Sequence, residues 1–134
     1  MSAPVYTHRV TARAEDIDML GHVNNAVWVR WIQEVAIAHW EAVAPPALVD
    51  EVFWVVSRHE IDYLRPLHEG EQVIARSWID PAAKGARSIR HVEFARDGRL
   101  HVRAATAWAM IDRASGRPAR VRPRHLAPFL AADD

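Results

Sequence analysis

One long helical pattern dominates the first third of this sequence and constrains the fold more than any other feature. From Ala26 to Val43, apolar residues recur every three or four positions, with polar residues between them. Asn24 and Asn25 stand directly before the pattern, where asparagine is a favoured cap, and Pro45 and Pro46 forbid its continuation. The sequence therefore predicts one long helix. Its expected apolar face consists of Trp28, Trp31, Ile32, Val35, Ile37 and Ala38.

Runs rich in β-branched and aromatic residues fill most of the remaining chain and predict strands. Pro66 and Pro81 end two of these runs, and the Asp97-Gly98 pair separates the last two. An Asp-Gly pair in this position is a strong hairpin signal, because both turn residues adopt positive φ. The expected strands are 5–13, 52–64, 71–80, 88–96 and 99–112, with irregular chain at 44–47 and a short terminal helix at 123–130.

The expected order is one strand, one long helix and four successive strands, so helices do not alternate with strands. This order disfavours a doubly wound parallel sheet and predicts an α+β fold, with a mostly antiparallel sheet packed on the helix. The helix covers only one face of such a sheet. The other face is expected to carry some of Trp54, Trp78 and Trp108, and it therefore predicts a partner subunit. The length of 134 residues fits a single domain over 1–134.

The composition excludes several classes of function. The chain has 17 basic and 17 acidic residues, whereas sequence-independent electrostatic binding of nucleic acid requires an excess of basic residues. It contains no cysteine, which excludes disulfides, thiolate metal sites and a catalytic thiol. No run approaches the ~18 apolar residues of a membrane span, and the first residues lack the pattern of a signal peptide. We therefore expect a cytoplasmic protein without a nucleic-acid partner, a membrane or a bound metal.

The segment 15–25 carries the residues best suited to chemistry. Asp16, Asp18, His22, Asn24 and Asn25 crowd a short loop between the first strand and the long helix. The N-terminus of a helix presents unpaired N–H groups and a partial positive charge, which stabilise the oxyanion formed when a thioester carbonyl is attacked. A nearby carboxylate attacks that carbonyl or deprotonates a water. Taken singly, the same residues also fit helix caps and turns.

Several stretches of the chain match one protein family. The loop contains Asp16-Ile17-Asp18 and Gly21-His22-Val23-Asn24-Asn25, and the helix continues with Trp28-Val29-Arg30-Trp31 and Glu34. This arrangement resembles the 4-hydroxybenzoyl-CoA thioesterase-like family, in which an Asp-x-Asp-x-x-Gly-His-Val-Asn-Asn string precedes an aromatic-rich helix with a glutamate. The stretches 61–66, 70–71 and 84–88 are similar to that family as well. The His-Val-Asn-Asn form is more similar to its acyl-CoA and acyl-carrier-protein branch than to its members with aromatic substrates.

The resemblance implies a hotdog fold, in which an antiparallel five-stranded sheet wraps around one long central helix. It implies hydrolysis of acyl-CoA or acyl-carrier thioesters to free acid and thiol. Coenzyme A then belongs to the substrate, and no separate cofactor is expected. The resemblance also implies a homodimer with joined sheets, often paired into a homotetramer, with active sites at subunit interfaces.

The resemblance assigns roles to individual residues of the loop. Asp18 matches the catalytic carboxylate of the family. The backbone N–H of Asn25, or of a neighbour at the helix start, is expected to polarise the thioester carbonyl. His22 or the side chain of Asn24 is expected to position water.

Two other acids have different expected roles. Asp16 is assigned to the structure of the loop. Glu34 is a second catalytic candidate, because some hotdog thioesterases place their catalytic carboxylate on this helix. Glu34 also fits an i,i+4 ion pair with Arg30, and the sequence leaves both roles open.

Cations for the phosphates of the carrier are expected near the turn before the fourth strand. Lys84, Arg87, Ser88 and Arg90 lie in or after this turn, where the family commonly binds the nucleotide end of coenzyme A. Strand alternation places Arg90 on the same face as Ser88 and Val92. A solvated hairpin is the alternative interpretation of these residues.

Two other functions remain as alternatives on the same fold. A hydratase acting on an enoyl or hydroxyacyl thioester resembles an Asp-x-Asn-Pro-x-His pattern, whereas no Asn-Pro precedes His22 here. A non-catalytic module would bind acyl thioesters without turnover. Release of free thiol from a saturated acyl-CoA separates the hydrolase from both alternatives.

Overall fold

The computed structural model describes residues 4–131. Its elements in chain order are β1 (Tyr6–Thr11), the 3-10 turn η1 (Ala14–Asp16), α1 (Asn25–Val43), α2 (Pro46–Glu51), β2 (Val52–Tyr63), β3 (Gln72–Ile79), β4 (Arg87–Arg96), β5 (Arg99–Asp112) and α3 (Pro123–Leu130). The strands form one sheet in the order β1-β3-β4-β5-β2, and every neighbouring pair is antiparallel. The predicted five-stranded antiparallel sheet with one long helix is therefore confirmed.

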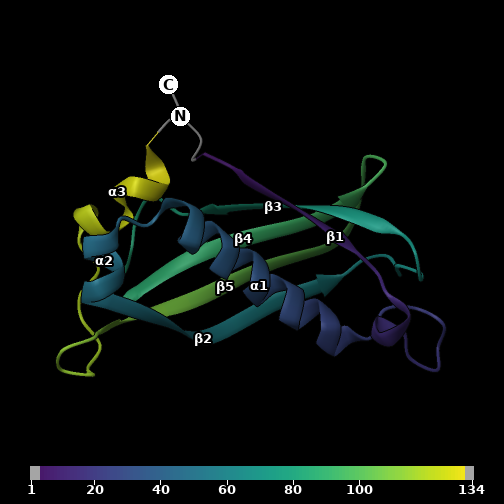
Figure 1. Ribbon diagram of the computed structural model, residues 1–134, viewed down its shortest axis with the longest axis horizontal. Coiled ribbons are helices and arrows are strands. Elements are labelled where there is room, and N and C mark those ends of the chain that lie inside the picture. Colours follow the sequence, from purple (N-terminus) through teal and green to yellow (C-terminus); the bar gives the residue numbers. More distant parts are fainter. Residues whose placement is uncertain (1–3, 132–134) are drawn as a thin grey trace.

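Helix α1 lies across one face of the curved sheet, which bends around it (Figure 1). The turn η1 and the loop before α1 lie at one end of the molecule, while α2 and α3 lie at the other end. The two ends of α1 thus define two different environments. Among the described residues, no helix is both long enough and apolar enough to cross a membrane.

The core lies between α1 and the inner face of the sheet. Trp28 packs edge-on against Trp31 and Phe94, with ring centroids 5.0 and 5.2 Å apart. The prediction that Ile37 belongs to the buried apolar face of the helix is wrong, because its side chain is 50% exposed. A period of 3.6 residues turns position 37 away from positions 35 and 39. The buried residues of α1 are Trp28, Trp31, Ile32, Val35, Ala36 and His39.

The tryptophans of the sheet divide between its two faces. Trp78 alternates with the buried Ser77 and Ile79 and therefore lies on the outer face, where its ring stacks on His91 at 5.4 Å. Trp108 pairs with the buried Ser88 and lies, like Trp54, on the side of α1. Some of these three tryptophans were expected on the outer face, and Trp78 is the one found there.

Local signals in the sequence account for most boundaries. Asp97 and Gly98 adopt the positive φ values of 50° and 75° that the predicted hairpin turn requires. The segment 44–47, predicted to be irregular, instead leads directly into α2, because Pro46 occupies the first helical turn, where a missing N–H leaves no hydrogen bond unmade. The terminal helix is confirmed as α3.

Candidate functional site

The loop before α1 fixes the carboxylate of Asp18. Its Oδ2 accepts a hydrogen bond of 2.9 Å from Nδ2 of Asn24, and its Oδ1 accepts one of 2.9 Å from the backbone N–H of Leu20. Backbone hydrogen bonds from Gly21 to Asp18 and from Asp18 to His22 close the turn. Gly21 has a φ of 84°, which glycine adopts without steric cost because it lacks a Cβ. The half-buried Asp18 side chain is therefore held in one place.

Asn24 connects this carboxylate to α1. It is the N-cap residue, and its Oδ1 accepts a hydrogen bond of 2.8 Å from the backbone N–H of Ala26. The N–H of Val27 donates to the Asn24 carbonyl at 2.9 Å. Within residues 4–131, the remaining donor of the first turn, the N–H of Asn25, has no acceptor. Asn24 thus links Asp18 to a helix end that carries a free N–H and a partial positive charge.

Asp16 has a structural environment. Its side chain is 3% exposed, and its carboxylate accepts hydrogen bonds of 2.9 Å from the backbone N–H of Arg13 and from Nη2 of Arg30. Nε of Arg30 lies 3.4 Å from Oε1 of Glu34 in the expected i,i+4 pair. The chain Asp16–Arg30–Glu34 therefore ties the turn η1 to the first half of α1.

The structure brings Asp18, Asn24 and Asn25 together. The carbonyl of His22 accepts a hydrogen bond from the N–H of Asp18, whereas Glu34 pairs with Arg30. Nδ1 of the half-buried His22 lies 3.4 Å from the carbonyl oxygen of Val23. Within the described chain, neither His22 nor Glu34 makes a side-chain hydrogen bond to Asp18. The sequence alone did not indicate that Asn24 serves as cap and carboxylate donor at once.

The surface around Asp18 is open and apolar. Met19 is 98% exposed and Leu20 is 72% exposed, although both are large apolar residues. A polar cavity lies nearby between β1, η1 and α1, and Asp16, Arg30 and Glu34 contribute to its wall. Asp18 lines neither this cavity nor the apolar one described below. Within one chain, the loop presents its carboxylate to a surface.

The four expected phosphate-binding residues divide into two pairs. Lys84 and Arg87 are exposed, whereas Ser88 and Arg90 are buried on the inner face, which agrees with their predicted alternation. The N–H of Val121 donates to the carbonyl of Gly85 at 2.8 Å. Arg120 and Arg122 flank Val121 and are exposed, so this bond places both residues near the turn that carries Lys84 and Arg87. The sequence did not connect them to this turn.

This basic cluster is far from Asp18 in one chain. Arg87 pairs with Ala109 on β5, whereas Val102 pairs with Tyr63, whose hydroxyl reaches the carbonyl of Asn25. At ~3.3 Å per strand residue, the stretch from Val102 to Ala109 separates the two places by roughly 20 Å.

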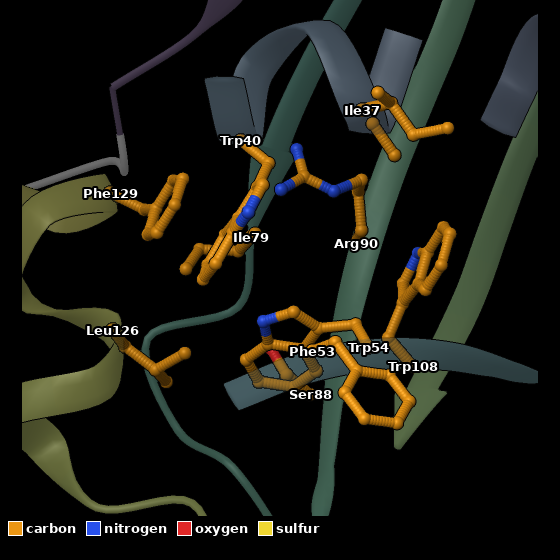
Figure 2. Close-up of a pocket in the computed structure, with 11 residues that line it drawn as sticks. Ile37, Trp40, Phe53, Trp54, Ile79, Ser88, Arg90, Trp108, Leu126 and Phe129 are labelled. Carbon is orange, nitrogen blue, oxygen red and sulfur yellow. The ribbon is translucent and has the colours of Figure 1, made fainter. Parts of the chain in front are cut away.

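A cavity of ≈ 220 Å³ lies between the second half of α1, the sheet and α3 (Figure 2). Aromatic rings dominate its wall, and a single arginine, Arg90, interrupts them. The residues of the wall are Ala36, Ile37, Trp40, Phe53, Trp54, Ile79, Ser88, Arg90, Trp108, Leu126 and Phe129.

Arg90 is the buried cation of this cavity, with 8% of its surface exposed. Its Nη1 donates to Ser77 Oγ at 2.8 Å and to His39 Nδ1 at 2.6 Å. Burial and the adjacent guanidinium lower the pKa of His39 to about 4, so His39 is neutral and accepts this bond. Burial lowers the pKa of Arg90 to about 10, which leaves it charged at neutral pH.

Among residues 4–131, no group of three or more His, Cys, Asp or Glu side chains is arranged to hold a metal ion.

Comparison with known proteins agrees with the fold. Residues 12–129 match the model of the thioesterase-like superfamily, and the chain belongs to this superfamily. The uncharacterized protein YsmA of Bacillus subtilis (strain 168) is 26% identical over 84 residues, which cover 63% of this chain and 56% of that protein. The match thus spans little more than half the length of that relative.

Solved structures of thioesterases share the architecture. A thioesterase from Thermus thermophilus, complexed with coenzyme A and Zn, is 27% identical with a TM-score of 0.81, over 97% of this chain and 100% of that one. A 1,4-dihydroxy-2-naphthoyl-CoA thioesterase from Synechocystis is 18% identical with a TM-score of 0.75, over 92% and 95% of the two chains. The chain therefore has the hotdog fold, and its family and fold support thioester hydrolysis in general.

Proposed function

We propose that this protein hydrolyses acyl thioesters of coenzyme A or a related carrier, with Asp18 as the catalytic carboxylate. One observation carries the proposal: the Asn24 side chain caps α1 and simultaneously donates to Asp18. The carboxylate is thereby held beside the free N–H of Asn25, at the positive end of a 19-residue helix.

This pairing supplies the two elements that thioester hydrolysis needs. The carbonyl oxygen of the substrate would accept a hydrogen bond from the N–H of Asn25 and gain negative charge there during attack. In one route, Asp18 attacks the carbonyl carbon and expels the thiolate, and water then hydrolyses the resulting anhydride. In the other, Asp18 takes a proton from the water that attacks the carbonyl. Both routes release the free acid and the thiol.

The other loop residues have supporting roles in this proposal. Asn24 orients Asp18, and the half-buried His22 is available to position water beside it. We assign Glu34 to structure, because its carboxylate pairs with Arg30, which in turn holds the buried Asp16.

We propose that a second copy of the chain completes the site. β2 is an edge strand, and large apolar residues along and after it are exposed: Val55 at 42%, Tyr63 at 42% and Leu64 at 47% (Figure 1). An unpaired edge strand offers free backbone N–H and C=O groups for pairing with another strand. Antiparallel pairing of β2 with its symmetry copy would set the Tyr63 end opposite the beginning of the partner's β2. The exposed loop around Asp18 would then face the cavity end of the other protomer.

The same arrangement accounts for the distant basic cluster. We propose that Lys84 and Arg87, joined by Arg120 and Arg122, bind the phosphates of coenzyme A. All four side chains are exposed and lie at the cavity end of the sheet. A partner's cluster would therefore lie nearer to Asp18 than the cluster of the same chain does.

A thiol-release screen tests the proposed function. The purified protein is incubated with acetyl-, hexanoyl-, palmitoyl- and benzoyl-CoA, and free coenzyme A is measured with a thiol reagent. Turnover of at least one saturated ester is expected, since neither a hydratase nor a binding module releases thiol from it. Tight binding of these esters without any thiol release would contradict the proposal.

A further inference from the structure

The cavity contains a positive charge that the protein does not neutralise. Arg90 is 8% exposed, and among residues 4–131 no carboxylate lies within ion-pair distance of it. Its hydrogen-bond acceptors, Ser77 and the neutral His39, both engage Nη1. Nη2 and Nε have no acceptor within the described chain. Buried charges in proteins are normally paired, because desolvation of an isolated ion is costly.

The other polar groups of the cavity wall are mainly donors too. Trp54 and Trp108 line the cavity, and within the described residues the buried indole N–H of each lacks an acceptor. Ser88 contributes a hydroxyl, and none of the described residues that line the wall is acidic. Such a wall complements a ligand that brings acceptors and a negative charge. It does not complement a purely apolar chain.

We propose that this cavity binds an organic acid with a small apolar body, such as an aromatic ring, whose carboxylate pairs with the guanidinium of Arg90. His39 and Ser77 hold one nitrogen of the guanidinium, which leaves the other two for the ligand. A dry cavity of ~150 Å³ in another protein accommodates benzene, so ≈ 220 Å³ suffices for a ring and a substituent. Trp40, Trp54 and Phe129 supply flat apolar surfaces for the ring.

Two kinds of ligand could bring such a carboxylate into the cavity. The carboxylate belongs either to a free acid or to the distal end of an acyl group whose other end forms the thioester. The second source rests on the proposed function, since it requires Asp18 of a partner to reach the thioester. The first source does not depend on catalysis.

Binding of a free acid tests the inference directly. The full chain is titrated with phenylacetate and with the neutral analogue phenylacetamide by calorimetry, with tryptophan fluorescence as a second signal. Phenylacetate is expected to bind at least tenfold more tightly. Equal affinities, or no binding of either compound at millimolar concentration, would overturn the inference. This comparison uses the wild-type protein and so does not depend on the folding of a variant.

Substitution of Arg90 then tests whether its guanidinium is the group that pairs with the carboxylate of the ligand. The Arg90→Met variant is expected to lose the preference for the carboxylate, while Arg90→Lys, which keeps a charge but not the planar fork of donors, retains only part of it. An unchanged preference in a folded Arg90→Met variant would place the anion elsewhere and overturn the assignment.

A hydrolysis comparison separates the two sources. The kcat/KM values of 4-carboxybenzoyl-CoA and benzoyl-CoA are measured side by side. A preference for the carboxylated ester that disappears in Arg90→Met identifies the acyl group as the source. Equal values together with tight phenylacetate binding identify the free acid. Phenylacetate binding without hydrolysis of any ester would contradict the proposed function but uphold the cavity assignment.

Discussion

Nδ2 of Asn24 donates a hydrogen bond of 2.9 Å to Oδ2 of Asp18, while Oδ1 of the same amide caps the first turn of α1. The position of the carboxylate thus depends on the helix whose N-terminus it faces. The Gly-His-Val-Asn-Asn part of the loop has a physical explanation in this link: glycine turns the chain, and the first asparagine joins acid and helix.

The two functions of Asn24 are separable by substitution. Asn24→Ser keeps a capping oxygen but loses the donor to Asp18, whereas Asn24→Ala loses both. We expect both variants to reduce kcat at least tenfold. Only Asn24→Ala should also lower the free energy of unfolding, by ~0.5–2 kcal/mol. Urea unfolding and steady-state kinetics on the same preparations make the comparison, and wild-type kcat in Asn24→Ser would refute the positioning role.

His39 makes stability depend on pH. Its pKa is about 4 in the folded protein and 6.5 when it is unperturbed. Between these values the unfolded chain binds a proton that the folded protein does not, so the free energy of unfolding falls as the pH drops from 7 to 5. Carboxylates contribute little in this window, because their usual pKa values are ~4. In His39→Gln, which keeps an acceptor for Arg90, the decline between pH 7 and 5 should be smaller; an identical decline would contradict this explanation.

Arg87 is expected to affect only substrates that carry the nucleotide. Arg87→Ala should raise KM for acyl-CoA several-fold and leave KM for the corresponding acyl-pantetheine unchanged, because the latter lacks the nucleotide phosphates. Arg99→Ala, which removes another exposed arginine at the Asp97-Gly98 hairpin, serves as the matched control. Equal changes for both substrates would remove Arg87 from phosphate binding.

The free edge of β2 predicts a dimer. Sedimentation of the wild-type protein at micromolar concentration should give twice the chain mass of 15.2 kDa, or four times if dimers pair. Val55→Lys should shift the protein toward monomers, because a charge on an edge strand disfavours pairing. Glu41→Lys, an exposed charge reversal on α1 away from this edge, is a control for charge alone. A wild-type monomer would contradict the shared site.

Patterns within short stretches of the sequence predicted most of the fold. The helix at 26–43 followed from its period and its flanking Asn24 and Pro45, and the last hairpin followed from Asp97-Gly98. Ile37 and Trp108 were harder to place. Their orientation depends on the rotation of α1 and on the register of β5 against β4, which only tertiary packing fixes.

The candidate site was predictable only where its residues lie close together in the sequence. The loop 15–25 is contiguous, so its acid and its cap were visible as a motif, although the bond between Asp18 and Asn24 was not. The environment of Arg90 joins His39 on α1 to Ser77 on β3 and Arg90 on β4. Strand alternation predicted the face of Arg90, but no local signal showed that α1 would bury it against a neutral histidine.

The turnover of an Asp18→Asn variant tests the central claim most directly. Hydrolysis of the best acyl-CoA is compared between wild type, Asp18→Asn and the control Glu41→Gln, which removes an exposed carboxylate on α1. We predict that Asp18→Asn lowers kcat by ~10²–10⁴-fold, the usual contribution of such a group, with an unchanged melting temperature, and that Glu41→Gln behaves as wild type. A folded Asp18→Asn variant that retains more than a tenth of the wild-type kcat would contradict the account.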